Sequence, residues 1–243
     1  MSTLDGKRIL VTGAGSGIGR AAARLFAARG AERVRVGRRL DALRETLPAA
    51  HHVALDHADE TAVAAFARDC PPLDGLFLNA GQFASGTVSD TPVAVFDAMW
   101  AANVRGPWLL CHHLGPRMRD GGSVVLTGST LGIRAVPGTA AYAVAKAGLH
   151  HLARVLAVEW APRGIRCNAI APGPVLTPML QARIDTSADP AAMRQALAQV
   201  NPLRRLGREE EIAALAAHLL ADESTWTTGT VIPCDGGATA AAS

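Results

Sequence analysis

Short apolar runs alternate along the chain with longer alanine-rich stretches. The apolar runs are rich in Val, Ile and Leu and predict strands at 8–12, 33–37, 51–55, 73–78, 123–127, 165–170 and 229–233. Between them, apolar residues recur with the period of a helix and predict helices at about 18–29, 61–70, 92–104 with a continuation past Pro107, 140–161 and 209–220. This alternation predicts an α/β fold, a doubly wound parallel sheet of seven strands with helices on both faces.

The chain is predicted to be a single domain over residues 1–243, because no linker or internal repeat divides it. A hydrophobic content of 49% with 19% charged residues provides for a substantial buried core. The stretch from Pro172 to Leu206 is predicted to be irregular, since prolines at 172, 174, 178, 190 and 202 interrupt it. A long loop in a compact domain commonly serves as a lid or a binding loop, so a substrate-binding loop is expected at about 173–206.

The composition argues against several other classes of protein. The net charge of +3 is spread thinly and aromatic residues make up 4%, so no nucleic-acid partner is expected. The first residues hold no apolar signal core and no later run is long enough to span a bilayer, so a soluble, cytoplasmic protein without a membrane partner is expected. Four widely spaced cysteines indicate reduced thiols. The histidines, including the pairs His112-His113 and His150-His151, are interpreted as surface or interface residues, and no metal site is predicted.

A glycine-rich turn follows the first predicted strand and opens the first predicted helix. It reads TGAGSGIGR at 12–20, with the spacing G-x-x-x-G-x-G at Gly13, Gly17 and Gly19. Backbone N–H groups and the positive end of the helix suit a dinucleotide pyrophosphate, and glycines remove side chains that would block its approach. Glycines also mark ordinary tight turns, but a strand before the turn and a helix after it favour dinucleotide binding.

The end of the second predicted strand decides which dinucleotide is expected. An acidic residue there would hold ribose hydroxyls, whereas a basic residue would accept the extra phosphate of NADP(H). The chain reads Val36-Gly37-Arg38-Arg39 and has no carboxylate at this place. The forked, permanently charged side chain of Arg38 suits a phosphate, so NADP(H) is predicted over NAD(H). The alternative is that Arg38 and Arg39 are solvated surface charges.

The only tyrosine, Tyr142, stands four residues before Lys146, one of two lysines in the chain. On the predicted helix their side chains share a face. A phenol with a pKa of about 10 exchanges protons poorly at neutral pH unless a nearby cation favours its ionised form, and Lys146 supplies that cation. The pair predicts general acid–base chemistry on a carbonyl or alcohol oxygen. Ser129, after the strand at 123–127, is predicted to orient that oxygen, with Thr127 and Thr130 as rival hydroxyls.

Several motifs in order make the chain resemble the short-chain dehydrogenase/reductase family, in its compact single-domain branch of NAD(P)-dependent alcohol dehydrogenases and ketoreductases. The resemblance runs from Lys7 to Gly237 and implies a Rossmann-type fold. The motifs are TGAGSGIG at 12–19, Asp56, NAG at 79–81, Asn103, Ser129, YxxxK at 142–146, PG at 172–173 and DGG at 235–237.

The resemblance implies catalytic roles for four residues. Tyr142 is the expected acid/base and Ser129 the donor to the substrate oxygen. Lys146 is expected to hold the cofactor ribose and activate the phenol, and Asn103 to anchor a water-linked proton relay.

The resemblance also implies cofactor contacts. Asp56 is expected at the adenine ring, Asn79 on the cofactor side of the sheet, and Val175 and Thr177 at the nicotinamide carboxamide. The expected cofactor set is Gly13, Ser16, Gly17, Ile18, Gly19, Arg38, Arg39, Asp56, Asn79, Ala80, Gly81, Tyr142, Lys146, Pro172, Gly173, Val175 and Thr177.

Two positions depart from the family pattern. The usual double asparagine before Ala-Gly is Leu78-Asn79 in this chain. Ser16 stands where some NADP-dependent members place a basic residue. The second departure leaves Arg38 as the main expected phosphate ligand.

The expected substrate pocket is mostly apolar and contains no arginine that could clamp a carboxylate or phosphate. A neutral ketone or alcohol is therefore predicted, and reduction of a 3-ketoacyl chain on a carrier protein stays open. The pocket positions are Gln82, Phe83, Leu131, Ile133, Val136, Met179 and Leu180.

The resemblance further implies a homo-oligomer. Family members usually bury the helices that correspond to 103–118 and 142–160 in a dimer contact, commonly within a homotetramer. The Ala- and Leu-rich faces of these segments allow such a contact.

Three other functions compete with an oxidoreductase acting on a secondary alcohol or ketone. A non-catalytic regulator that senses dinucleotides on the same fold need not keep the four catalytic residues, so their presence disfavours it without excluding it. A sugar-nucleotide epimerase or dehydratase would need a larger C-terminal domain than the chain after Pro172 provides. An enoyl reductase would have a wider spacing between Tyr and Lys.

Overall fold

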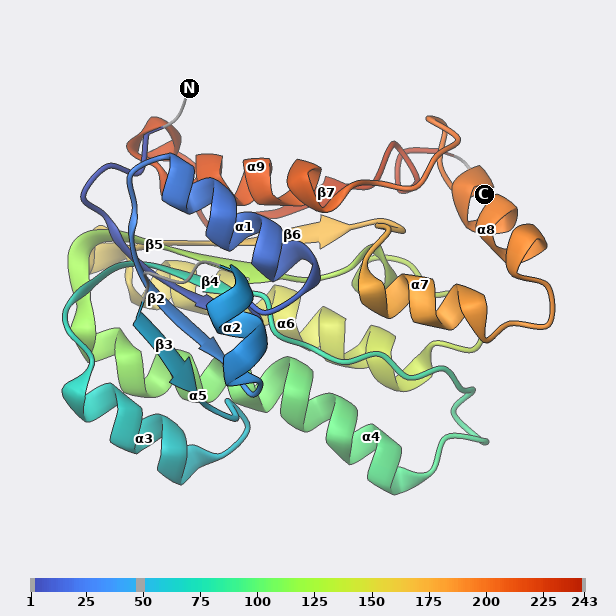
Figure 1. The fold of residues 1–243 in the computed structure, drawn as a ribbon, viewed down its shortest axis with the longest axis horizontal. Helices are drawn as coiled ribbons and strands as arrows, with labels where there is room; N and C mark the ends of the chain where they lie inside the picture. The colour runs from blue at the N-terminus through green and yellow to red at the C-terminus, as the bar shows by residue number, and fades with distance from the viewer. Residues whose placement is uncertain (1–2, 47–50, 242–243) are drawn as a thin grey trace.

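The computed structural model describes residues 3–46 and 51–241. Within these ranges seven parallel strands form one sheet in the order β3-β2-β1-β4-β5-β6-β7 (Figure 1). The order reverses between β1 and β4, which places the crevice of a doubly wound sheet at the carboxyl ends of these two strands. The strands are β1 (Arg8–Thr12), β2 (Glu32–Gly37), β3 (His51–Ala54), β4 (Leu73–Leu78), β5 (Met118–Thr127), β6 (Arg166–Pro172) and β7 (Val231–Cys234).

Helices cover both faces of this sheet (Figure 1). One face carries α1 (Gly17–Ala28), α2 (Leu40–Thr46) and α9 (Glu209–Leu220). The other carries α3 (Glu60–Asp69), α4 (Val93–Trp100), α5 (Gly106–Leu114) and α6 (Ala140–Glu159). Beyond the carboxyl end of β6 stand α7 (Pro178–Asp185) and α8 (Pro190–Gln199). The predicted architecture, a doubly wound parallel sheet with helices on both faces, is confirmed.

Strand β4 shows how the sheet builds a core on each face. Leu76 and Leu78 belong to the apolar cluster covered by α3, α5 and α6, whereas Phe77 belongs to the cluster covered by α1 and α9. All three side chains are buried, as a strand covered on both faces requires. Phe77 meets Phe26 of α1 edge to face, with 5.8 Å between the ring centroids. A continuous apolar run is therefore needed here, because both faces of the strand are in contact with helices.

The stretch from Pro172 to Leu206 contains α7 and α8, so the prediction that it is irregular is wrong. Pro178 and Pro190 are the first residues of these helices, where the missing N–H costs no intrahelical hydrogen bond. The preceding residues, Thr177 and Asp189, cap the helices by accepting hydrogen bonds from backbone N–H groups three positions later, at 3.2 and 2.9 Å. Proline begins both helices instead of interrupting them.

Two other elements also differ from those predicted from the sequence. The helix α2 is not predicted, although its Leu43 is buried in the core on the face of α1. The strand β5 begins at Met118, earlier than the predicted Ser123, and a register shift against β4 accompanies its early part.

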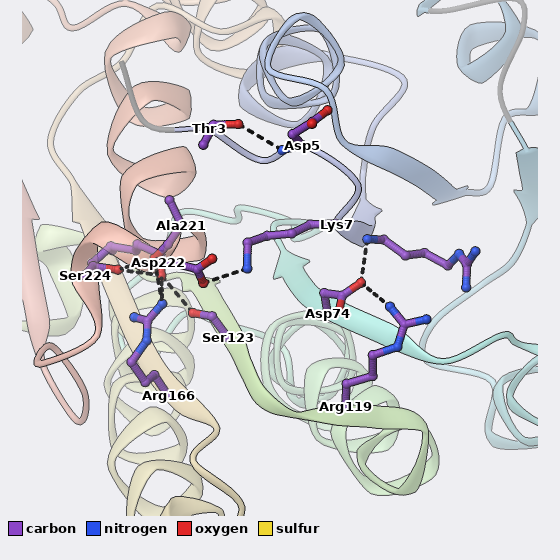
Figure 2. Close-up of polar contacts among 12 residues, drawn as sticks. Thr3, Asp5, Lys7, Asp74, Arg119, Ser123, Arg166, Ala221, Asp222 and Ser224 are labelled. Carbon is purple, nitrogen blue, oxygen red and sulfur yellow. Dashed lines mark hydrogen bonds and ion pairs between the residues drawn. The ribbon is translucent and has the colours of Figure 1, made fainter.

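Polar contacts close the amino-terminal end of the sheet (Figure 2). Lys7 Nζ forms an ion pair with Asp222 Oδ1 at 2.7 Å. Asp74 Oδ2 accepts hydrogen bonds from the backbone N–H of Arg8 and from the guanidinium of Arg119, both at 2.7 Å. One of the two lysines is therefore engaged at the end of the sheet that lies away from the crevice.

Candidate active site

One threonine joins the carboxyl ends of β1 and β4. Thr12 Oγ1 accepts hydrogen bonds from the backbone N–H groups of Asn79 at 2.9 Å and Ala80 at 3.0 Å. Asn79 Oδ1 accepts a hydrogen bond from Thr127 Oγ1 at 3.2 Å. The Thr127 hydroxyl, one of the two rivals to Ser129, is therefore bonded to Asn79. Three neighbouring strand ends are thereby held together. No role is predicted for Thr12 from the sequence, although its place at a strand end could have suggested one.

Three glycines shape the turn between β1 and α1. Gly13 and Gly17 have φ angles of +67° and +59°, which side chains rarely tolerate. A Cβ on Gly19 would collide with the carbonyl oxygen of Gly13. The predicted contact residue Ile18 packs its side chain against the core, so a cofactor would meet its backbone. The turn leads directly into α1, and this arrangement fits the pyrophosphate of a dinucleotide.

A cleft of about 310 Å³ opens beside this turn. Arg38 and Arg39 follow β2 at its side, and both are exposed. Within the described ranges, no carboxylate forms an ion pair with either arginine. The cleft brings together seven of the predicted cofactor residues, namely Gly13, Ser16, Arg38, Arg39, Asp56, Ala80 and Gly81.

The predicted cofactor residues after β6 are placed differently. Pro172 is buried as the last residue of β6, and the N–H of Gly173 donates a hydrogen bond to the carbonyl oxygen of Cys234 at 3.2 Å. Val175 is buried in the core, so any contact with a cofactor would come from its backbone. Thr177 lies near Gly17, because a Cβ on this glycine would be 3.7 Å from Thr177 Cβ.

Tyr142, Lys146 and Ser129 come together at the carboxyl end of β5. Tyr142 and Lys146 lie one turn apart on α6, with Lys146 Nζ 5.5 Å from the centre of the Tyr142 ring. Lys146 Nζ donates a hydrogen bond to the carbonyl oxygen of Thr127 at 2.7 Å. The Ser129 hydroxyl lies beside Tyr142, near enough to lower the pKa of the phenol, and it accepts a hydrogen bond from the N–H of Leu131 at 3.1 Å. The structure therefore brings three of the four predicted catalytic side chains into direct proximity.

Burial sets the protonation of these side chains. It raises the pKa of Tyr142 to about 12, while the hydrogen bond with Ser129 acts in the opposite direction. It lowers the pKa of Lys146 to about 8. Loss of solvent dominates the pKa of the phenol in the protein alone, and the expectation that Lys146 favours the ionised form stays a prediction. Tyr142 carries its proton at neutral pH and is able to donate it.

Asn103, the fourth predicted residue, lies in a π-helical turn, Ala101–Arg105, between α4 and α5. Its buried Nδ2 donates to the carbonyl oxygens of Gln82 and Met99, both at 3.0 Å, and its Oδ1 accepts from the N–H of Gln82 at 3.3 Å. A Cβ on Gly81 would lie 2.6 Å from Asn103 Oδ1, so glycine is required where the loop after β4 passes. The side chain anchors this loop, and its part in a proton relay stays a prediction.

Two predicted substrate positions lie directly at the site. Phe83 meets Tyr142 edge to face, with 5.0 Å between ring centroids, and Gln82 lines the cleft. From α7, Arg183 places its guanidinium carbon 4.6 Å from the centre of the Phe83 ring. Arg183 is not predicted from the sequence, because no helix is expected in this stretch. The remaining positions lie on α7 and on the segment between Ser129 and α6: Leu131, Ile133, Val136, Met179 and Leu180.

Two histidines support the site. His150 is buried on α6, and its Nε2 accepts a hydrogen bond from the N–H of Ser129 at 3.2 Å. Burial and the nearby Lys146 cation lower the pKa of His150 to about 4. His57 Nε2 is 2.9 Å from a carbonyl oxygen of the π-helical turn. The interpretation of His150 as a surface or interface residue is therefore wrong; its position four residues after Lys146, on the same helix face, could have indicated its place.

In the part of the chain that the structure describes, no three His, Cys, Asp or Glu side chains are placed to hold a metal ion.

Known proteins share the sequence of this chain over most of its length. The family model described as enoyl-(acyl carrier protein) reductase matches residues 13–239. Levodione reductase from Leifsonia aquatica is 38% identical, over 96% of this chain and 94% of its own. The 2-keto-3-deoxy-L-fuconate dehydrogenase from Xanthomonas campestris is 34% identical, over 96% of this chain and 80% of its own.

Solved structures share the fold. The crystal structure of levodione reductase has a TM-score of 0.90 at 37% identity and covers 97% of this chain and 98% of its own. A candidate NAD(P)-dependent gluconate 5-dehydrogenase from Beutenbergia cavernae, with NADP bound at low occupancy, has a TM-score of 0.90 at 30% identity and covers 98% and 99%. These matches agree with the geometry of the glycine turn and with the grouping of Ser129, Tyr142 and Lys146. The chain belongs to the short-chain dehydrogenase/reductase family of oxidoreductases, which act on alcohol and carbonyl groups.

Proposed function

We propose that the protein is an NADP(H)-dependent oxidoreductase that interconverts a secondary alcohol and a ketone. The observation that carries this proposal is the grouping of the Tyr142 and Ser129 hydroxyls with the buried Lys146, whose Nζ is 5.5 Å from the centre of the Tyr142 ring. This group adjoins the cleft, since a Cβ on Gly81 in the cleft lining would be 3.5 Å from Lys146 Nζ. Two hydroxyls directed at one oxygen suit proton transfer to a carbonyl and stabilisation of the charge that develops on it.

Each of the three residues has a part in the reduction. When bound, NADPH supplies the hydride for the carbonyl carbon. The Tyr142 phenol, which is neutral at neutral pH, donates its proton to the carbonyl oxygen, and the Ser129 hydroxyl donates a hydrogen bond to the same atom. The positive charge of Lys146 stabilises the phenolate that this transfer leaves. In the reverse direction the phenolate accepts the proton of the alcohol.

The two arginines after β2 support NADP(H) over NAD(H). Arg38 and Arg39 are exposed at the side of the cleft that begins at the glycine turn, on the strand end where the ribose is expected. Neither is paired with a described carboxylate, so both are available to a phosphate. The relative from Beutenbergia cavernae is described with NADP bound, which agrees with this proposal.

The proposed substrate is a small ketone or the corresponding alcohol. The relatives named above act on levodione and on 2-keto-3-deoxy-L-fuconate, which supports a small molecule. A 3-ketoacyl chain would undergo the same reaction, whereas reduction of an enoyl bond is disfavoured by the four-residue spacing of Tyr142 and Lys146. The expectation of a neutral substrate depends on the absence of an arginine near the pocket, and Arg183 over Phe83 removes that premise.

We also propose that the protein is a homodimer or homotetramer. The layer formed by α5 and α6 exposes large apolar side chains, among them Trp108, Val144 and Val158. Apolar surface of this kind on a helix layer commonly marks a contact between protein chains.

A cytoplasmic location is our further inference. All four cysteines, Cys70, Cys111, Cys167 and Cys234, are free thiols, which fits a reducing compartment. Among the described residues, no helix has both the length and the apolar character needed to cross a membrane.

The proposed function is tested by following NADPH oxidation, with NADH in parallel, across aliphatic, aryl and cyclic ketones and keto acids. Turnover that requires Tyr142 and prefers NADPH is the expected result. Tight NADPH binding without turnover of any ketone would instead favour a regulator that senses dinucleotides.

A further inference from the structure

We propose that Arg183 binds a carboxylate on the substrate, so that the enzyme acts on short keto acids or hydroxy acids; this rests on the proposed oxidoreductase function. Arg183 lies on α7, and its Cζ is 4.6 Å from the centre of the Phe83 ring. Phe83 meets Tyr142 edge to face at 5.0 Å between ring centroids. A guanidinium therefore stands one aromatic ring away from the phenol that exchanges the proton.

The guanidinium of Arg183 is available to an anion. In the ranges that the structure describes, no carboxylate pairs with it, and the contact that its side chain makes is with the Phe83 ring. The neighbouring polar groups are engaged with one another. Gln181 Nε2 donates to Asp185 Oδ1 at 2.5 Å, and Gln181 Oε1 accepts from Arg194 of α8 at 2.6 Å. Asp185, a carboxylate on the same helix, is thus paired with Gln181.

The chemistry of the surrounding positions favours a carboxylate. A guanidinium stacked on an aromatic ring keeps its N–H edge free, and its fork matches the two oxygens of a carboxylate. None of the seven predicted pocket positions is acidic, and six of them are apolar, so an anion would meet no repulsion from them. A carboxylate a few bonds from the ketone would contact Arg183 while the ketone oxygen contacts Tyr142 and Ser129.

The competing explanation is that Arg183 only holds α7 against Phe83 as a lid. A lid contact would act on every substrate alike, because it involves no charge on the substrate. A carboxylate contact acts only on acids. The two explanations therefore differ in how the loss of Arg183 changes the preference between an acid and its ester.

The test compares α-, β- and γ-keto acids with their methyl esters, using NADPH and the full-length protein. Wild type should prefer at least one acid over its ester. Arg183→Met should raise the KM for that acid by about 10- to 100-fold, the range for a hydrogen-bonded charged pair, and change the KM for its ester far less. Arg183→Lys should keep part of the preference. Arg194→Met is the matched control, since Arg194 bonds to Gln181 and should leave the preference intact.

Equal losses for acid and ester in Arg183→Met, or no preference for any acid in wild type, would overturn the proposal. A second measurement separates it from the proposed function. Calorimetric binding of the same keto acids to the NADP-loaded Tyr142→Phe protein should weaken about 10-fold or more when Arg183→Met is added. If no ketone is reduced, the proposed function fails, and Arg183 is judged by this binding alone: acid binding that is absent or independent of Arg183 contradicts the proposal.

Discussion

The backbone N–H of Ser129 donates a hydrogen bond to Nε2 of His150 at 3.2 Å, between the end of β5 and helix α6. Because Nε2 is the acceptor, this nitrogen must be unprotonated, and the lowered pKa of His150, about 4, keeps it so at neutral pH. The backbones of Gly128 and Gly132 pass so close that a Cβ on either would collide with the ring. The ring therefore fixes the segment that presents the Ser129 hydroxyl to the substrate.

Replacing His150 with Leu should weaken the loss of stability in acid. The folded pKa of about 4 lies below the reference value of 6.5, so the unfolded chain binds the proton first as the pH falls. The contribution of neutral His150 to the free energy of unfolding is complete above pH 6.5. It is lost as the pH falls toward 4, by on the order of 3 kcal/mol. Urea unfolding between about pH 4 and 7 should show a smaller decline for His150→Leu than for wild type or for His151→Leu, an exposed neighbour. Identical declines in all three would contradict this role.

Lys146→Met should raise the free energy of unfolding while it removes activity. Burial lowers the pKa of Lys146 from 10.5 to about 8, so the folded protein bears a cost for the charge below pH 8, and this cost disappears as the pH rises to 10.5. After allowance for the lost hydrogen bond to Thr127, the gain at neutral pH should be about 2 kcal/mol. Thermal unfolding at neutral pH and near pH 10 measures it. A variant that is less stable than wild type at neutral pH would show that the buried charge is better paired than the structure indicates.

Arg38→Ser should weaken NADPH binding by about 10-fold or more and leave NADH binding nearly unchanged, since only NADPH carries the additional phosphate. Titration of the intrinsic fluorescence with each cofactor measures both affinities. Arg44→Ser on α2 is the matched control, because Arg44 is also exposed but does not line the cleft, and it pairs loosely with Asp41 at 3.9 Å. An equal loss for both cofactors would mean that Arg38 does not recognise the phosphate.

Sedimentation velocity should show dimers or tetramers in the wild-type protein. Val158→Asp places a charge at a position of α6 that is 76% exposed in the single chain, so it should shift the population toward monomers. Val88→Asp, in the loop before α4, is the control, because that side chain is 84% exposed and belongs to neither α5 nor α6. A wild-type protein that is only monomeric would refute the proposed assembly.

The strands and long helices could be predicted from the sequence because each carries a strong local pattern. β1 and β4 are predicted with their observed bounds, and α9 is too, since its apolar face recurs regularly between the acidic residues at its start and the end of the helix. The helices α7 and α8 could not be recognised in the same way. Their prolines look like interruptions until the capping residues Thr177 and Asp189 are considered together with them.

The site residues could be predicted where a sequence motif identifies them, but not where packing in the folded protein determines the contact or the pKa. Ser129, Tyr142 and Lys146 follow from spacing and strand ends, and the structure brings them together. The raised pKa of Tyr142 could not follow from spacing, because it is burial in the folded protein that raises it. Arg183 reaches Phe83 only through the fold of α7, and a single sequence does not show that approach.

The rate of NADPH oxidation by Tyr142→Phe tests the central claim most directly. The variant keeps the aromatic contact with Phe83 but lacks the phenol proton, so NADPH should still bind while the rate with the best ketone falls by about 10²- to 10⁴-fold. A variant that binds NADPH and reduces the ketone at the wild-type rate would contradict the account, because Tyr142 would then not be the acid that protonates the substrate.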